Sequence, residues 1–473
     1  MMDKAKLARN WIFFAIVSFS LTFSNAMISG RIGINYGRNG DNLPSAFEAI
    51  EHLQNMNAYR VKIFDASPEV LKLLSGTKLQ VSIMIPNEQL PDIASNQDVA
   101  DQWVIENVLP YYPKTMIRYI MVGNEVLSVK NDTVLWYNLV PAMINVHNAI
   151  KLQNISNIKI GTPLAMDIME STFPPSNGKF RDDMPVYEVL VPLLNFLNKT
   201  NSFFFVNVYP YLSWLENPNK ISLDFALFTA NNSSYNDPGS SLNYTNLLDQ
   251  MLDSVHFAAL KIGYENVSLA ISETGWPHSG DIDQPGANIH NAATYNRNLI
   301  RKTTAFPPLG TPARPGVVIP TFIFSLFDEN LKPGPRTERN WGLLNPNGKP
   351  IYELDLTGAR LDREYSRLPE PWNNLPFKGK IWCVAAVDAN VADLRDALDL
   401  ACNGGNGICE SLAPLKDCYQ PLSEVAHASY AFSSYWAKYR NSSNGVHCHF
   451  NGLAMQTTID PSHGSCRYPS VTL

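Results

Sequence analysis

Short apolar runs alternate with longer amphipathic segments between residues 31 and 356. The runs are rich in β-branched and aromatic residues, which is typical of strands covered on both faces. Apolar residues recur every third or fourth position in the segments between them, which predicts helices. The predicted strands are residues 31–35, 59–64, 79–85, 117–122, 158–161, 203–208, 267–271 and 318–324. The predicted helices are residues 45–56 (with Phe47, Ile50 and Leu53 on the apolar face), 100–109, 134–152, 187–197, 244–262 and 292–303.

This alternation predicts an α/β fold, a (β/α)8 TIM barrel, over residues 30–356. Eight strands separated by helices is the number that such a barrel requires. A doubly wound open sheet is the alternative, but no glycine fingerprint follows the first strand. In a barrel the C-terminal ends of all strands open onto one face, where catalytic residues gather.

The pattern changes after the predicted barrel. Charges together with Pro369, Pro371 and Pro376 favour a stiff linker over residues 357–380. Every cysteine of the chain lies beyond it, and an even, clustered set indicates a disulfide framework. We therefore expect a small disulfide-rich α+β module over residues 381–468. Its six cysteines, for which about 15 pairings are possible, are Cys383, Cys402, Cys409, Cys418, Cys448 and Cys466.

The N-terminus predicts a signal peptide over residues 1–26. A positively charged start precedes an apolar run at residues 11–23, and small residues follow it. The run is too short for a comfortable membrane span, although an uncleaved anchor is the alternative. We therefore expect a secreted chain with no membrane anchor after signal removal. Acceptor sequons for N-glycosylation, which support export weakly, begin at Asn131, Asn154, Asn198, Asn231, Asn232, Asn243, Asn266 and Asn441.

Composition narrows the class of partner only slightly. The formal net charge of −6 and a pI near 5.9 give no basic footprint for nucleic acid, so none is expected as a partner. The many aromatic residues serve either a packed core or flat surfaces for ligands, and composition does not decide between these.

Two glutamates follow the fourth and the seventh predicted strands. Glu125 stands in VGNEV (122–126) and Glu273 in SETGWP (272–277). They are far apart along the chain, and a closed barrel brings both to one pocket. Paired carboxylates across a cleft suit glycosidic bond cleavage, in which one protonates the leaving oxygen and the other attacks the sugar or activates water. For either glutamate alone, a strand cap or a salt bridge is the alternative.

Six motifs follow one another along the predicted barrel: IGINYG (32–37), VGNEV (122–126), NVYPY (207–211), SETGWP (272–277), FDENLKPGP (327–335) and ERNWGL (338–343). Their order resembles the plant family 17 glycoside hydrolases, which are endo-β-1,3-glucanases. The resemblance implies a retaining reaction with Glu273 as nucleophile and Glu125 as general acid/base, whose carboxyl groups should lie about 5–5.5 Å apart. His278 and Pro285, in the loop after the seventh strand, depart from the family pattern.

The same resemblance suggests which residues bind substrate. Tyr209 is expected to hydrogen-bond the nucleophile, with a packed core tyrosine as the alternative. Trp276 is expected to border the cleft, with packing at the rim as the alternative. Three charged residues after the last strand resemble cleft-lining residues, with a surface ion network as the alternative. The predicted substrate-binding residues are Tyr36, Asn124, Tyr209, Trp276, Glu329, Lys332 and Glu338.

The cysteine-rich tail resembles carbohydrate-binding module family 43. The resemblance implies the pairs Cys383–Cys448, Cys402–Cys409 and Cys418–Cys466, and binding of β-1,3-glucan. His447 and His449 flank Cys448 and would suit a metal, but a cysteine from an even disulfide set is not expected to bind one. No metal and no cofactor are expected. Tyr430 and Trp436 are candidate glucan contacts, with packing in a helix core as the alternative.

Together these resemblances predict retaining endo-hydrolysis of β-1,3-glucosidic bonds in β-1,3-glucans such as callose, laminarin-like polymers and fungal wall glucan. The alternatives are a non-catalytic glucan-binding protein of the wall and a β-1,3-glucan transglycosylase. We expect a monomer in the cell wall or apoplast, with the vacuole as another possibility. Wall remodelling and plant defence both fit the family.

Overall fold

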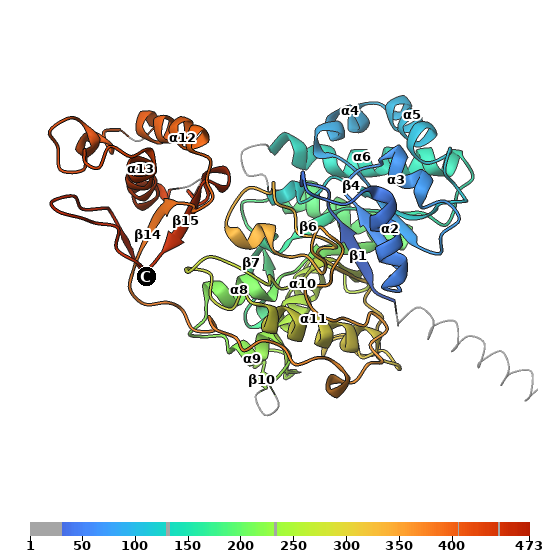
Figure 1. Ribbon diagram of the computed structural model, residues 1–473. Coiled ribbons are helices and arrows are strands. Elements are labelled where there is room, and N and C mark those ends of the chain that lie inside the picture. The colour runs from blue at the N-terminus through green and yellow to red at the C-terminus, as the bar shows by residue number, and fades with distance from the viewer. Residues whose placement is uncertain (1–30, 129–132, 231–233, 405, 443–444) are drawn as a thin grey trace, which may run out of the picture.

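The computed structural model describes residues 31–128, 133–230, 234–404, 406–442 and 445–473. The predicted signal peptide, residues 1–26, and the sequons at Asn131, Asn231 and Asn232 lie outside these ranges. A large barrel and a smaller module stand side by side, and an extended stretch of chain joins them (Figure 1).

The barrel is built on one parallel sheet, as predicted, and the open-sheet alternative is wrong. Its first strand pairs with both the second and the last, so the ends of the pattern meet. Each of the eight predicted runs overlaps a strand of this sheet within the described residues. These strands are β1 (Gly33–Tyr36), β2 (Arg60–Ile63), β3 (Gln80–Ile85), β4 (Met116–Val122), β5 (Lys159–Gly161), β9 (Phe203–Asn207), β12 (Ser268–Thr274) and β13 (Thr321–Ile323).

The fifth strand closes the ring by changing its partner. Its first part, β5, pairs with β4, while β6 (Pro163–Ala165), which follows after Thr162, pairs with β9. The sheet order β5-β4-β3-β2-β1-β13-β12-β9-β6 therefore begins and ends on neighbouring segments of one stretch of chain. This closure gathers the C-terminal ends of the strands around one opening.

Helices cover the outside of the barrel (Figure 1). The first predicted one is α2 (Ala46–Asn55), which begins at a capping box between Ser45 and Glu48. Its buried face is Ala46, Ala49, Ile50 and Leu53, whereas Phe47 is 57% exposed, so the predicted place of Phe47 on this face is wrong. The other predicted helices are α5 (Gln97–Asn107), α6 (Thr133–Leu152), α7 (Val191–Thr200), α10 (Leu247–Lys261) and α11 (Ile289–Thr304).

Four short helices were not predicted, because a pattern of one or two turns has too few apolar positions to establish a period. Within the described residues, no helix has both the length and the hydropathy needed to cross a bilayer. The short helices are α3 (Pro68–Leu73), α4 (Leu90–Ser95), α8 (Pro210–Glu216) and α9 (Leu223–Ala226).

The module has its own core and its own antiparallel sheet. The central strand β14 pairs with β15 on one side and with β16 on the other. Because β16 lies beyond residue 468, the module extends past the predicted end. Its elements are β14 (Lys380–Ala385), α12 (Val391–Gly404), α13 (Glu424–Tyr439), β15 (Ala454–Thr457) and β16 (Val471–Thr472).

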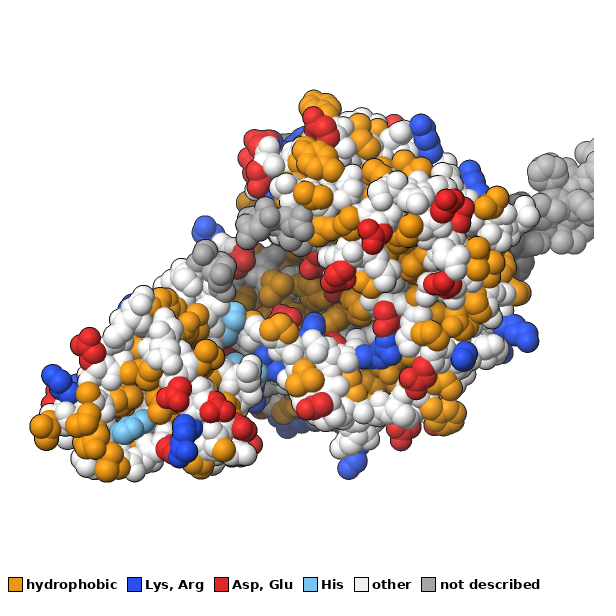
Figure 2. All heavy atoms as spheres, turned by 90° about the horizontal axis from the view of Figure 1, so that it is seen from above, with side chains coloured by type: hydrophobic (Ala, Val, Ile, Leu, Met, Phe, Trp, Pro, Cys, Tyr) orange, Lys and Arg blue, Asp and Glu red, His pale blue; other side chains and the backbone are white. Residues whose placement is uncertain are grey.

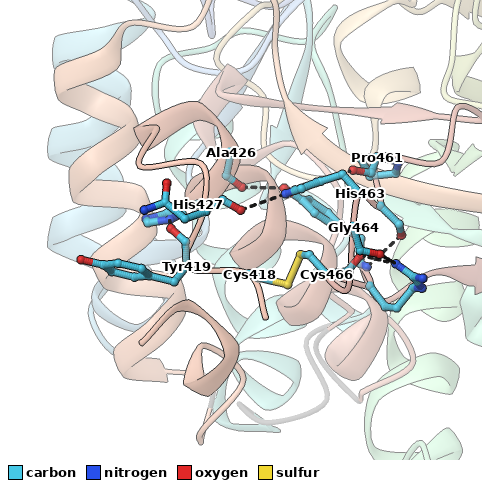
Figure 3. Close-up of a disulfide and its surroundings, with 12 residues drawn as sticks. Cys418, Tyr419, Ala426, His427, Pro461, His463, Gly464 and Cys466 are labelled. Carbon is cyan, nitrogen blue, oxygen red and sulfur yellow. Dashed lines mark hydrogen bonds between the residues drawn. A yellow bond between two sulfur atoms is a disulfide. The ribbon is translucent and has the colours of Figure 1, made fainter. Parts of the chain in front are cut away.

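The six cysteines form the pairs that the resemblance implied, all in the part of the chain that the structure describes. The Cys418–Cys466 disulfide joins the loop before α13 to the C-terminal segment, and His427 and His463 lie around it (Figure 3). Both histidines hydrogen-bond backbone carbonyl groups. Cys448 is bonded to Cys383, so it offers no thiolate to a metal.

Tyr430 and Trp436 of α13 are only 7% and 2% exposed. They belong to the packed interior of the module, as the alternative reading had it, and are not surface contacts for glucan.

Candidate active site

A cleft of about 1200 Å³ opens at the C-terminal ends of the barrel strands. Segments that follow β1, β4, β9 and β13 line it together with the end of β12, so residues from the whole length of the barrel sequence meet there. Both predicted catalytic glutamates, Glu125 and Glu273, are among the lining residues. Figure 2 shows the hollowed face of the barrel, with acidic side chains in and around the hollow.

Glu273 is held by two side chains, one from strand β2 and one from the segment that follows β9. Its strand, β12, ends one residue later, and only 6% of the residue is exposed. The ammonium group of Lys62 on β2 lies 2.6 Å from Glu273 Oε1 and also donates to Ser272 Oγ at 3.0 Å. The Tyr209 hydroxyl donates to Glu273 Oε2 at 2.9 Å, which confirms the predicted hydrogen bond. The cation and the hydroxyl both stabilise the ionised carboxylate.

Lys62 itself is completely buried. Burial lowers its pKa from the usual value, and the negative charge of Glu273 opposes this effect. A buried lysine is costly unless it is paired, and here it is paired with a carboxylate at the centre of the cleft. This ion pair therefore indicates a role in the chemistry of Glu273.

Glu125 follows β4 on a turn that needs glycine. Gly123 has φ +70°, and a Cβ there would lie 2.4 Å from Val126 Cγ2. Glu125 itself has φ 50°, a conformation that non-glycine residues rarely adopt and that costs about 1–3 kcal/mol. The side chain of Asn87 holds this turn by bonding both the N–H and the C=O of Asn124. These contacts fix the backbone of the turn and so the direction in which the carboxyl group of Glu125 points.

Asn207 connects the two glutamates. Its Nδ2 donates to Glu125 Oε1 at 2.7 Å, and its Cα is the register partner of Glu273 across β9 and β12. Burial and the charge of Glu273 raise the pKa of Glu125, while the bond from Asn207 and the charge of Lys62 partly oppose this. The carboxyl group of Glu125 is thus biased toward its protonated form, whereas that of Glu273 faces the cation of Lys62.

This arrangement can carry out acid catalysis and nucleophilic attack at one linkage. Two carboxyl groups whose environments differ in this way divide into a proton donor and an ionised partner. The separation of about 5–5.5 Å, which a retaining glycosidase needs, stays a prediction.

Most of the predicted substrate-binding residues line the cleft. Glu329 is 4% exposed and accepts a hydrogen bond from the Asn39 N–H at 2.8 Å, so it is not part of a surface ion network. Asn124 Oδ1 accepts no hydrogen bond from the described residues, which leaves it available to a hydroxyl group. The lining residues among those predicted are Tyr36, Asn124, Tyr209, Glu329, Lys332 and Glu338.

The prediction for Trp276 is wrong. Its side chain is 1% exposed, does not line the cleft, and donates from Nε1 to the carbonyl of Gly286 at 2.8 Å. It packs behind the cleft against Tyr211 and Tyr295. A tryptophan that does line the cleft is Trp341, whose ring centroid is 4.9 Å from that of Tyr209.

Sequence reasoning missed Lys62, Asn207 and Trp341 as site residues. The signal for Lys62 was a lysine between Val61 and Ile63 in a buried strand, and the signal for Asn207 was its position at the end of β9. His278, which departs from the family pattern, pairs with Asp328 at 2.9 Å beside the cleft wall. This contact joins the loop after β12, which carries His278, to the loop after β13, which carries Asp328.

Comparisons with known proteins agree with this geometry. Residues 32–356 match glycosyl hydrolases family 17, and residues 381–455 match the X8 domain. A probable glucan endo-1,3-beta-glucosidase of Arabidopsis thaliana is 55% identical over 446 residues, covering 94% of this chain and 92% of the relative. Glucan endo-1,3-beta-glucosidase 12 of Arabidopsis thaliana is 37% identical over 480 residues, covering 97% and 87%.

Two solved structures are similar to the barrel. A beta-1,3-glucanase and allergen of Cryptomeria japonica pollen is 40% identical with a TM-score of 0.65, covering 69% of this chain and 99% of that one. One of two plant beta-glucan endohydrolases with distinct substrate specificities is 34% identical with a TM-score of 0.62, covering 68% and 100%.

Proposed function

Because this chain belongs to family 17 of the glycosyl hydrolases, we propose that Glu273 and Glu125 are the residues that cleave its glucan. The chain is a glycoside hydrolase that carries a C-terminal X8 domain, a module of the family 43 type. Its activity is endo-hydrolysis of β-1,3-glucosidic bonds in β-1,3-glucans. The observation that carries the assignment of roles is the ion pair of Glu273 with buried Lys62, beside the raised pKa of Glu125.

In the first step, Glu273 attacks the anomeric carbon while Glu125 donates its proton to the leaving glycosidic oxygen. A covalent glycosyl–enzyme ester forms on Glu273, and the part of the glucan that carries the protonated glycosidic oxygen leaves. The raised pKa of Glu125 supports this role, because the donor must still hold its proton when Glu273 is ionised.

In the second step, Glu125, now ionised, removes a proton from water. The water attacks the anomeric carbon, the bond to Glu273 breaks, and the product keeps its configuration. The hydrogen bond from Asn207 favours the ionised form of Glu125 during this step.

We extend the proposal to the rest of the chain. Residues 30–356 form the catalytic domain, residues 357–380 the linker, and the module begins at residue 381. The separate cores of barrel and module support this division. The disulfides fit an oxidising environment, so we propose secretion of a monomer to the wall or apoplast.

Product analysis of laminarin digestion tests the function, with NMR of the first product to identify the anomer. We expect internal cleavage and a β-configured product. Glu125→Gln should lower kcat by about 10²–10⁴, and Glu273→Gln by at least as much. Glu51→Gln, on the exposed side of α2, is the control and should match wild type.

Three outcomes would contradict the proposal. Full activity of Glu273→Gln would exclude it as the nucleophile. A wild type that cleaves no glucan would favour the binding-protein alternative. Products longer than the substrate would favour transglycosylation.

A further inference from the structure

We propose that the module is docked on the barrel at the rim of the cleft and lengthens the glucan-binding surface, so that one polymer chain contacts both parts. The inference rests on the proposed function but adds a binding surface to it. It differs from the usual picture of a binding module on a free linker, which only raises the local concentration of enzyme at a polymer.

The docking contact is made by the loop that follows β12. Asp283 Oδ1 accepts a hydrogen bond from Gln456 Nε2 at 2.9 Å, and the Asp283 N–H donates to Gln456 Oε1 at 3.3 Å. The Asp283 carboxylate also pairs with Arg440 at 3.4 Å. Next to it, Ile282 packs against the hydrophobic core of the module. Two-way hydrogen bonds, an ion pair and apolar packing therefore meet at two adjacent residues.

The module presents its half of this contact on rigid elements. Gln456 lies in β15 and is 8% exposed. Arg440 caps the C-terminal end of α13, and its guanidinium lies 4.9 Å from the ring centroid of buried Trp436. Because both side chains are already oriented by the module, little conformational entropy is lost when they bind Asp283.

The loop is also fixed to the barrel. Gln284 is 5% exposed, donates to Thr337 Oγ1 at 2.8 Å, and accepts from the Asp281 N–H at 2.8 Å. Thr337 belongs to the short helix η6 (Arg336–Arg339). This helix carries Glu338, which lines the cleft. The docking loop and the rim of the cleft are thus one braced unit.

The linker reinforces this arrangement, because it is bound to the same loop. Asn288 Nδ2 donates to Asn373 Oδ1 at 2.7 Å and to Asn374 Oδ1 at 2.9 Å. Asn291 Nδ2 donates to Asn374 Oδ1 at 2.8 Å, and the Gly286 N–H donates to the Asn373 carbonyl at 2.7 Å. A stretch held by these bonds cannot act as a free tether.

The module places two histidines next to the rim helix. Burial and the charges of Arg339 and Arg336 lower the pKa of His449 to about 4, and burial together with Arg339 lowers the pKa of His447. The imidazole of His449 is therefore neutral near pH 6, and the lowered pKa of His447 favours its neutral form. A neutral imidazole both donates and accepts hydrogen bonds, as sugar hydroxyl groups require. Figure 2 shows histidine side chains where the module borders the hollowed face of the barrel.

Kinetics on glucans of two lengths, combined with small-angle scattering, test the inference. Asp283→Lys places a cation against Arg440 and removes the acceptor for Gln456. We expect a larger radius of gyration and a KM for long laminarin that is about 10²-fold higher, the low end of what linked binding sites provide. The KM and kcat for short laminari-oligosaccharides, which fit within the cleft alone, should stay at wild-type values.

Asp388→Lys, at an exposed position of the module, is the matched control and should change none of these quantities. The charge-swapped pair Asp283→Arg with Arg440→Asp should restore part of the wild-type KM. Unchanged scattering of Asp283→Lys would overturn the docking, and an expanded particle with unchanged KM for long laminarin would overturn the longer binding surface. Activity of wild type on the short substrates tests the proposed function separately, since it needs no module.

Discussion

The ammonium nitrogen of Lys62 lies 2.6 Å from Oε1 of Glu273, and neither side chain is more than 8% exposed. The two residues come from β2 and β12, which are not neighbours in the sheet. Their contact therefore crosses the interior of the barrel. It depends on closure of the ring, and it puts a fixed positive charge beside the proposed nucleophile.

Lys62→Met should slow the enzyme without weakening substrate binding. Without the cation, the carboxylate of Glu273 loses the charged partner that orients it for attack. We expect kcat to fall by about 10²–10³-fold, the usual cost of removing one electrostatic partner at a reacting centre, while KM stays close to wild type. Steady-state kinetics on laminarin measure both quantities.

Lys302→Met is the control for this substitution, because Lys302 pairs with buried Asp249 at 2.8 Å away from the cleft. It should lower the melting temperature and leave kcat at the wild-type value. Wild-type kcat in Lys62→Met would show that the lysine only supports the fold.

Asn207→Ala should move the alkaline side of the pH profile. The hydrogen bond from Asn207 lowers the pKa of Glu125, so its loss raises that pKa further. A general acid works while protonated, and the rate falls as pH rises through its pKa. The alkaline limb of kcat/KM should therefore move to higher pH, with a lower maximum because the carboxyl group loses its orientation.

Asn296→Ala offers a matched comparison, since Asn296 is equally buried but binds the hydroxyl of Tyr352. Its profile should keep the wild-type shape. A downward shift of the alkaline limb in Asn207→Ala would contradict the assigned direction.

Glu125→Gln should stabilise the fold while it abolishes most activity. Folding raises the pKa of Glu125 above its unfolded value of about 4.3. The free energy of unfolding of wild type therefore falls as pH rises from the unfolded pKa through the folded pKa. The melting temperature of the variant should therefore exceed that of wild type at pH 7. The difference should vanish below about pH 3, where the group is protonated in both states. Calorimetry at the two pH values measures this, and a lower melting temperature at pH 7 would refute it.

Gly123→Ala should damage the site, whereas Gly76→Ala should not. Both glycines have positive φ, +70° and +75°, and the strain of alanine there is about 1–2 kcal/mol. At Gly76 no atom lies within 4 Å of the added Cβ, but at Gly123 it meets Val126 at 2.4 Å. We expect at least a ten-fold loss of kcat for Gly123→Ala and wild-type kcat for Gly76→Ala. Equal kcat for the two would mean that the turn tolerates displacement.

The barrel could be predicted because its information is local. An apolar run such as residues 79–85 predicts a buried strand from its own sequence alone. Eight such strands are compatible with only a few topologies. The fifth strand was harder, since its division between β5 and β6 depends on which neighbour each half reaches. The hydrophobic pattern does not indicate whether each half pairs with β4 or with β9.

The pair of glutamates was predictable because both lie near the C-terminal ends of strands. Glu273 is the last residue but one of β12, Glu125 follows β4 by three residues, and closure of the barrel brings both into the cleft. Their roles and the other predicted cleft residues came from the family resemblance. The prediction for Trp276 was wrong because a ring just past a strand can turn either into the cleft or behind it. Its bond to Gly286 and its packing on Tyr211 settle that choice through contacts that no local motif contains.

The loop after β12 also bears on how such enzymes can be taken apart and recombined. Ile282, Asp283 and Asn288 lie in the barrel sequence, yet they bind the module and its linker. A chimera that grafted residues 357–473 onto a different family member would leave these partners behind. The transplant would need residues 281–291 as well, so the unit of exchange is larger than the cysteine-rich segment.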